Sequence, residues 1–293
     1  MVMFFLYSIG QWLALSLPLS LAYRVGAWFT FFKYVFSPGE RRAMRNNLKV
    51  ILGENHPGVK KYPKQIYANF GKYLVNFFRT EEVDKQFIEK YIRIKNKQNM
   101  EEALSKGKGA IGLTAHIGNW ELCAQVMGIL GYKMNAVALS HNNKKIDDFF
   151  VQQRQRKGIN VIPVGISVRK CFSALKNNEI VGILGDRDFS GENGIFVNFL
   201  GKELFAPLGA AVLSLRTGAA IVPAFVIRDE KDDRYFDYIF EKPIYPEKTG
   251  NEKQEVRTLT QKYVDVIAKY VKKYPTQWFV FHEFWKATKS EIV

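Results

Sequence analysis

The stretch AIGLTAHIGNWEL, residues 110–122, decides how this chain folds. Residues 110–115 are mostly apolar, have the length of a buried strand and follow Gly107 and Gly109. Asn119 can cap a helix that follows, because its side-chain oxygen can accept a hydrogen bond from the first turn. The stretch therefore predicts a strand, a turn that carries His116, and a helix with Glu121 in its first turn, where the helix dipole favours an anion.

The following segments continue the alternation of strands and helices. Further strands are predicted over residues 134–139, 159–163 and 180–184, and helices over residues 119–130, 145–157 and 167–176. Strands separated by helices of this length favour a mostly parallel sheet with right-handed crossovers. We therefore expect an α/β fold with a central sheet flanked by helices. Additional β pattern is present at residues 196–199, 221–228 and 235–241, and helices are predicted at residues 38–53, 63–79, 81–102 and 252–274.

His116 is predicted at the carboxyl end of its strand, where open α/β sheets leave a crevice. Residues 116 and 121 are too far round a regular helix to share one face, so they can act together only if His116 precedes the helix. With 28 acidic residues and 4 histidines in 293 residues, a histidine followed five positions later by an acid arises by chance in roughly one such chain in three. The spacing alone is weak evidence, and the residues around it have to carry the interpretation.

The chain opens with an uncharged run of 23 residues, which ends before Arg24 and is long enough to span a bilayer, although Pro18 interrupts it. A cleaved secretory signal is one alternative, but residues 1–7 lack the basic residues with which such signals begin. An interfacial or hairpin helix is another. We expect an uncleaved membrane anchor with the body on the cytoplasmic side, because basic residues near a membrane segment stay on that side. These residues are Arg24, Lys33, Arg41, Arg42, Arg45 and Lys49.

The net charge of +15 is compatible with nucleic acid, anionic lipid or an acidic protein as partner. No common nucleic-acid-binding motif is visible and the basic residues follow a membrane-like run, so anionic lipid is favoured over nucleic acid. The two cysteines, Cys123 and Cys171, form no C-x-x-C motif, which argues against a disulfide framework or a structural zinc site. No metal or redox cofactor is implied.

Four segments together resemble one protein family. The string HIGNWEL at residues 116–122 resembles the H-x-x-x-x-[DE] block of the lysophospholipid acyltransferase superfamily, and specifically its branch of bacterial lipid A late (lauroyl or myristoyl) acyltransferases. Three other segments resemble blocks of that branch in the right order: RRAMRNNLKVILG at residues 41–53, GDRDFSGENGIFVNFLGKELFAPLGAAVLSLRTGAAIVPAF at residues 185–225 and YPTQWFVFHEFWK at residues 274–286. The resemblance covers about the whole chain.

The resemblance implies a glycerolipid-acyltransferase-like fold and an O-acyltransferase that moves a fatty acyl chain from acyl carrier protein to a hydroxyl of a lipid A precursor. Taken with the N-terminal run and the basic residues after it, the resemblance leads us to expect an anchor region at residues 1–37, a catalytic domain at residues 38–293, and a place on the cytoplasmic face of the inner membrane. An enzyme that uses acyl-CoA or another glycolipid acceptor, such as a phosphoinositide mannoside, is the nearest alternative. A non-catalytic lipid-binding scaffold is a further alternative, against which the intact pair of His116 and Glu121 argues.

Acyl transfer needs a base for the acceptor hydroxyl and hydrogen-bond donors for the oxyanion. The neutral imidazole of His116 can take the proton, while Glu121 is expected to accept a hydrogen bond from the other ring nitrogen and stabilise the imidazolium. Backbone N–H groups around Gly118 and Asn119, at the start of the helix, could bind the oxyanion.

Arg154, Arg187 and Asn119 are the candidates for substrate binding. Arg187 follows the strand that ends at Leu184 and could bind a substrate phosphate, or it could form a local surface ion pair with Asp186 or Asp188. Arg154 fits the Arg-rich segment of the branch that the sequence RQRKG resembles. The chain departs from many relatives at residues 140–141, where it has Ser and His in place of an arginine after the preceding strand.

Overall fold

The computed structural model describes residues 2–140, 143–164, 167–187 and 194–285. The chain forms two compact units. The first unit consists of Met1–Phe87 and Tyr270–Lys286, and the second contains Ile88–Lys269. The predicted division into an anchor at residues 1–37 and a catalytic domain at residues 38–293 concerns function rather than compactness, and it stays a prediction.

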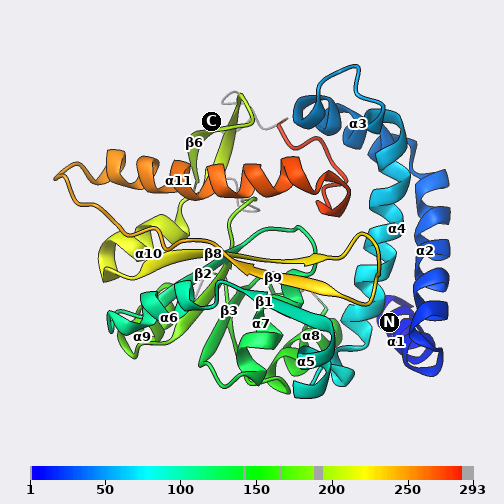
Figure 1. Cartoon of the computed structure of the whole chain (residues 1–293), viewed down its shortest axis with the longest axis horizontal. Helices are drawn as coiled ribbons and strands as arrows, with labels where there is room; N and C mark the ends of the chain where they lie inside the picture. Colours follow the sequence, from blue (N-terminus) through cyan, green and yellow to red (C-terminus); the bar gives the residue numbers. More distant parts are fainter. Residues whose placement is uncertain (1, 141–142, 165–166, 188–193, 286–293) are drawn as a thin grey trace. The chain divides into compact units, whose positions relative to one another are not determined.

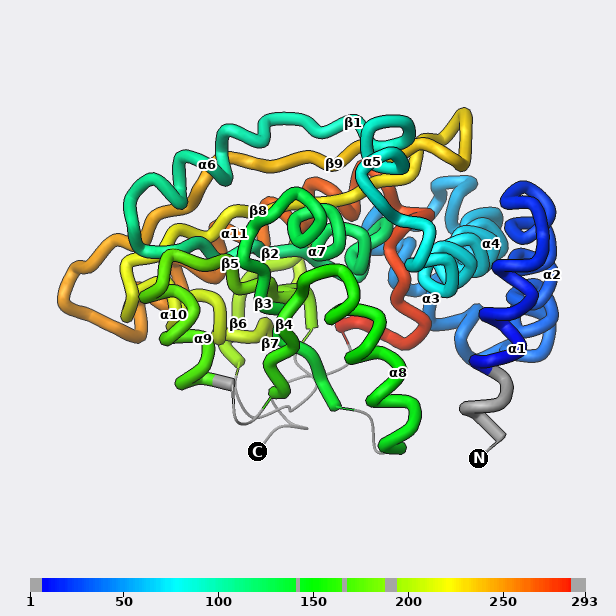
Figure 2. Tube along the Cα trace, turned by 90° about the horizontal axis from the view of Figure 1, so that it is seen from below, coloured from blue at the N-terminus to red at the C-terminus, as the bar shows by residue number. Residues whose placement is uncertain are grey.

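The second unit is built on a seven-stranded sheet with the order β1-β9-β8-β2-β5-β3-β4. All neighbouring strands are parallel except β8 and β9 (Figure 1), and Figure 2 shows the strands in this order from β1 to β4. The predicted mostly parallel sheet is therefore confirmed. The strands are β1 (Ile92–Lys95), β2 (Ala110–Thr114), β3 (Met134–Ala138), β4 (Ile159–Pro163), β5 (Ile180–Leu184), β8 (Ala220–Arg228) and β9 (Phe236–Phe240).

Helices connect the strands and cover the sheet. Figure 1 shows α11 above the sheet and α7 and α8 below it. Two asparagines start the helices that position the site: the Asn119 side chain accepts a hydrogen bond from the N–H of Leu122, and Asn143 does the same at the start of α8. The helices are α5 (Lys85–Tyr91), α6 (Gln98–Ser105), α7 (Trp120–Ile129), α8 (Lys144–Gln155), α9 (Ser167–Lys176), α10 (Gly209–Thr217) and α11 (Glu252–Lys273).

Strand β8 forms the centre of the core, because all nine of its residues are buried. A strand covered by structure on both faces reads as a continuous apolar run, which is why residues 221–228 were recognisable as a strand. The neighbouring β2 is also buried, with Ala110, Ile111 and Leu113 fully shielded from solvent. The strand that leads into His116 is thus packed in the centre of the core.

The structure differs from the sequence-based expectation in three places. The helix predicted over residues 81–102 is instead the 3₁₀ helix η1 (Thr80–Glu82), then α5, β1 and α6. Strand β1 exists because it pairs with β9, a partner more than 140 residues away in the chain. The antiparallel ribbon of β6 (Gly194–Phe199) and β7 (Lys202–Pro207) was predicted only in part, and α10 was not predicted.

The first unit is helical and contains α1 (Val2–Ser16), α2 (Leu19–Phe36), α3 (Pro38–Leu52), α4 (Gly58–Phe78) and the 3₁₀ helix η2 (Pro275–Gln277). The uncharged N-terminal run is divided between two helices, since α1 ends before Pro18 and α2 begins after it. Helices α2 and α4 approach closely at Gly26 and Gly71, where a side chain on either residue would collide with the other backbone. In the part of the chain that the structure describes, no helix is both long enough and apolar enough to cross a membrane.

Candidate active site

His116 lies two residues beyond the end of β2 and four residues before the start of α7, so the prediction that it precedes the helix is confirmed. The turn between them requires Gly118, whose φ is +62° and whose Cα lies so near the carbonyl oxygen of Val226 that a Cβ would collide with it. The N–H of Asn119 donates to the same carbonyl oxygen over 2.8 Å. These contacts tie the turn to β8 and fix the position of His116.

Asp186 holds the imidazole of His116. The Nδ1 atom of the ring lies 2.8 Å from Oδ1 of Asp186, and the backbone N–H of His116 donates to Oδ2 over 3.2 Å. The sheet register explains the pairing: Thr114 of β2 lies beside Leu184 of β5, so the residues two positions beyond each strand meet at the carboxyl edge. Two side chains that are 70 residues apart in the sequence thereby become a hydrogen-bonded pair.

Asp186 is suited to hold a positive imidazolium. Its side chain is completely buried, and Nε of Arg187 lies 3.6 Å from its Oδ2. Burial by itself would raise the pKa of this carboxyl, but the charge and hydrogen bond of His116 and the nearby guanidinium of Arg187 hold the pKa of Asp186 well below its usual range. An ionised Asp186 accepts a hydrogen bond from Nδ1–H, which leaves Nε2 of His116 as the nitrogen that can take a proton.

Glu121 lies in the first turn of α7, as predicted, but it does not make the predicted hydrogen bond to His116. Both of its carboxylate oxygens accept hydrogen bonds from Arg154, over 2.6 Å from Nη2 and 3.1 Å from Nε, and among the described residues no hydrogen bond joins Glu121 to His116. The side chain of Glu121 extends from the first turn of α7 towards α8, whereas the ring of His116 faces the end of β5. The contact expected from Glu121 is therefore made by Asp186, and the catalytic role of Glu121 stays a prediction.

The structure also specifies the surroundings of the other candidates. Arg154 is bound to Glu121 and Arg187 lies beside Asp186, so each has an acidic neighbour, and their binding of substrate stays a prediction. Asn119 is buried and caps α7, and since its N–H is bound by Val226, the N–H of Gly118 remains as the oxyanion candidate of the two. Asp188 and His141 lie outside the described residues.

Two further side chains define the chemistry near the ring. The indole of Trp120 packs against the imidazole of His116, with ring centroids 5.2 Å apart. Burial raises the pKa of the Cys123 thiol to about 12, which keeps it protonated and unsuited to nucleophilic attack. Within the described ranges, no group of three or more His, Cys, Asp or Glu side chains is placed to hold a metal ion. The arrangement fits a histidine base that activates a hydroxyl directly.

The pair of Glu121 and Arg154 is expected to contribute to stability, because it is a bidentate ion pair whose side chains are only 10% and 15% exposed. Replacing Glu121 with alanine would remove the carboxylate that accepts two hydrogen bonds from the mostly buried guanidinium of Arg154 and should cost about 3 to 5 kcal/mol of unfolding free energy. The double variant Glu121→Ala/Arg154→Ala should lose less than the sum of the single variants in urea unfolding. The matched control is Glu101→Ala, which removes the exposed pair with Lys97 and should change little. Unchanged stability in Glu121→Ala would contradict this structural role.

The sequence matches the protein family described as bacterial lipid A biosynthesis acyltransferase over residues 1–287. It is 25% identical to a phosphatidylinositol mannoside acyltransferase from Mycobacterium tuberculosis, over 97% of this chain and 89% of that protein. The corresponding protein from Mycolicibacterium smegmatis is 24% identical, over 97% of this chain and 92% of that protein. A lipid A biosynthesis acyltransferase from Haemophilus influenzae is 23% identical, over 52% of this chain and 48% of that protein.

Among solved structures, the 1-acyl-sn-glycerophosphate acyltransferase from Thermotoga maritima aligns with 90% of this chain and 100% of its own, with 11% sequence identity and a TM-score of 0.40. The family match extends over both compact units and includes all the site residues described above. The chain therefore belongs to the bacterial lipid A biosynthesis acyltransferase family.

Proposed function

We propose that the chain transfers a fatty acyl group from a thioester donor to a hydroxyl of an anionic glycolipid, with His116 as the general base. The hydrogen bond between His116 and the buried Asp186 is the observation that carries this proposal, because it prepares Nε2 of an acyltransferase-family protein to accept a proton.

The reaction follows from this geometry. Nε2 of His116 takes the proton of the acceptor hydroxyl as its oxygen attacks the thioester carbonyl. The negative charge of the tetrahedral intermediate lies on the former carbonyl oxygen, for which the N–H of Gly118 is the proposed donor. The intermediate collapses with loss of the thiolate, which takes the proton from the imidazolium, while the ionised Asp186 stabilises that imidazolium throughout. No acyl-enzyme intermediate is needed.

Two acceptors and two donors fit this chemistry. The sequence motifs favoured a lipid A precursor, but the relatives that match 97% of the chain are named phosphatidylinositol mannoside acyltransferases, whereas the lipid A relative matches 52%. The relatives therefore support a phosphoinositide mannoside better than a lipid A precursor. Both acceptors carry anionic headgroups, for which Arg187 is the proposed partner. Acyl carrier protein and acyl-CoA present the same thioester.

We further propose that the enzyme works on the cytoplasmic face of the inner membrane, as the basic residues after the N-terminal apolar run suggest.

A substrate panel tests the proposed function. The purified full chain is incubated with acyl-CoA or acyl carrier protein as donor and with a phosphatidylinositol mannoside, a lipid A precursor or unglycosylated phosphatidylinositol as acceptor. Mass spectrometry should show the addition of one acyl group to a glycolipid, with more product from the mannoside than from the lipid A precursor. The variant His116→Ala serves as the inactive control. Acylation of phosphatidylinositol alone, or hydrolysis of the donor without transfer, would rule out a glycolipid acceptor.

A further inference from the structure

Helices α1 and α2 expose an unusual concentration of large apolar side chains. Ten such residues lie within residues 9–36, whereas the rest of the described chain exposes five, in separate places. The most exposed are Phe36 at 76% and Trp12 at 66%. We call these ten residues the apolar face: Ile9, Trp12, Leu15, Leu21, Trp28, Phe29, Phe31, Phe32, Val35 and Phe36. A concentration of this kind on a folded protein marks a surface that contacts a membrane or another protein.

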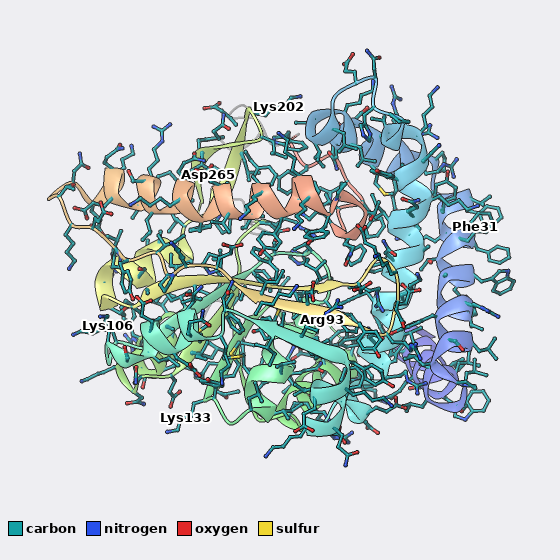
Figure 3. The ribbon with its side chains drawn as sticks, in the orientation of Figure 1. Phe31, Arg93, Lys106, Lys133, Lys202 and Asp265 are labelled. Atoms are coloured by element: carbon teal, nitrogen blue, oxygen red, sulfur yellow. The ribbon has the colours of Figure 1, made fainter. Side chains whose placement is uncertain are left out.

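The helical spacing of α2 places four of these side chains on one face of that helix. Leu21, Trp28, Phe32 and Val35 recur at intervals of seven, four and three residues, which places them on one helix face. Residues such as Tyr23 are buried on the opposite face, where the hydroxyl of Tyr23 donates to Asn76 of α4 over 2.7 Å. Figure 3 shows the side chain of Phe31 extending outward from α2. One face of α2 is thus buried against α4, and the other face is exposed.

The apolar face is arranged for the surface of a bilayer and not for crossing it. The 18 residues of α2 would extend about 27 Å, but they include Arg24 and Lys33. One side of α2 is also fixed to α4, which carries Lys64 and Lys72. A helix that is attached along its length to a charged helix can be buried on its free side only.

Positive charge predominates in the segment that carries the apolar face. The segment Met1–Phe87 contains 12 Lys and Arg residues and 5 Asp and Glu residues. The ammonium group of Lys64 lies 5.1 Å from the ring centroid of Phe31, and the side chain of Lys33 is 50% exposed. An apolar helix face bordered by basic side chains fits a membrane that contains anionic lipids, since the rings enter the acyl region while the cations meet headgroups. A second copy of the chain fits less well, because it would bring an equal positive charge to the same contact.

We propose that the apolar face of α1 and α2 docks on an anionic lipid bilayer and inserts to a depth of about 5 to 10 Å without crossing it. This inference deepens the proposed function by specifying how an enzyme for membrane glycolipids reaches its acceptor. It differs from a membrane-spanning anchor, and agrees with the alternative of an interfacial helix, because the proposed contact extends to Phe36 and is made by the side of a helix. Its test uses binding alone, so it can fail independently of the proposed reaction.

The depth of Trp28 tests the orientation. Trp28 lies near the middle of α2, so a spanning helix would place it at the bilayer centre, whereas a helix lying flat places it near the headgroups. The full chain is added to vesicles of phosphatidylcholine and phosphatidylglycerol with bromine near the headgroup end or near the methyl end of the acyl chains. The fluorescence of Trp28 is obtained by subtracting the signal of the Trp28→Phe variant from that of the native chain. This fluorescence should be quenched more by bromine near the headgroup end of the acyl chains than by bromine near the methyl end. Stronger quenching by the deep bromine would overturn the flat orientation.

A matched pair of variants tests the contact itself. Phe29 and Val168 are both 56% exposed on helices, so Phe29→Glu and Val168→Glu make the same charge change on equally exposed apolar side chains. Phe29→Glu should weaken vesicle binding by about 10-fold or more, and Val168→Glu should leave it unchanged. Binding of the native chain should fall with added salt and with removal of phosphatidylglycerol.

Three outcomes would contradict the proposal. Equal effects of Phe29→Glu and Val168→Glu would show that the apolar face is not the contact. Native binding that does not depend on phosphatidylglycerol would remove the role of charge. A dimer that Phe29→Glu dissociates, with no vesicle binding, would assign the face to a second copy of the chain. Since His116→Ala should bind vesicles normally and Phe29→Glu should acylate a detergent-dispersed acceptor, failure of docking and failure of the reaction are distinguishable.

Discussion

Replacing His116 with alanine should lower the rate of acyl transfer by about 100- to 10,000-fold, because it removes the group that takes the proton of the acceptor hydroxyl. The ring lies at the edge of the sheet, and the turn is held independently by the backbone contacts of Gly118 and Asn119 with Val226. Folding should therefore be retained, as circular dichroism can establish. The rate is measured as product formation with saturating donor and acceptor.

His56→Ala provides the matched control, because His56 is an exposed histidine of the first unit. Its Nδ1 atom accepts a hydrogen bond from the backbone N–H of Gly58. This variant should transfer acyl groups at the native rate. A folded His116→Ala variant with near-native turnover would exclude His116 as the base.

Asp186→Asn should reduce turnover about as severely, by roughly 1,000- to 10,000-fold, although it changes one atom and leaves the size of the side chain intact. The amide of the new side chain can donate a hydrogen bond to Nδ1 of His116. It would then favour the tautomer with its proton on Nε2, the nitrogen that must be free to act as a base. The double variant His116→Ala/Asp186→Asn should be little worse than either single variant, since the two residues act as a unit.

Glu121→Gln separates the two acidic residues. It retains the shape of the side chain beside Arg154 and does not alter the partner of the imidazole, so turnover should fall less than in Asp186→Asn. A greater loss in Glu121→Gln than in Asp186→Asn would restore Glu121 to the role that the motif suggested. Both variants are compared by kcat at the same pH.

The lowered pKa of Asp186 also has a consequence for stability. A carboxyl whose pKa is lower in the folded state than in the unfolded chain stabilises the fold above the unfolded value, which is about 3.9 for aspartate. This contribution is lost as the pH falls below that value towards the folded pKa. Asp186→Asn should remove this part of the acid dependence, which can be followed by urea unfolding over a series of acidic pH values.

Much of the fold could be predicted from the sequence, because its signals are local. The strands β2, β4 and β5 lie where short apolar runs predicted them, and α11 lies within one residue of its predicted end. Buried parallel strands are apolar on both faces, so they are recognisable without knowledge of their neighbours. Strand β1 was mistaken for helix because its identity comes from pairing with β9, which no local pattern contains.

The sequence by itself determined the class of fold, the family and the position of His116 ahead of a helix capped by Asn119. Only the tertiary structure decided which acidic residue forms a hydrogen bond with that histidine. The register of β2 with β5 brings Asp186 to the imidazole ring, whereas Glu121 binds Arg154 of α8. The tertiary structure also decided which apolar side chains of the N-terminal run are buried and which are exposed. Hydropathy reports that side chains are apolar, but only packing on α4 shows which of them are buried and which remain exposed on the apolar face.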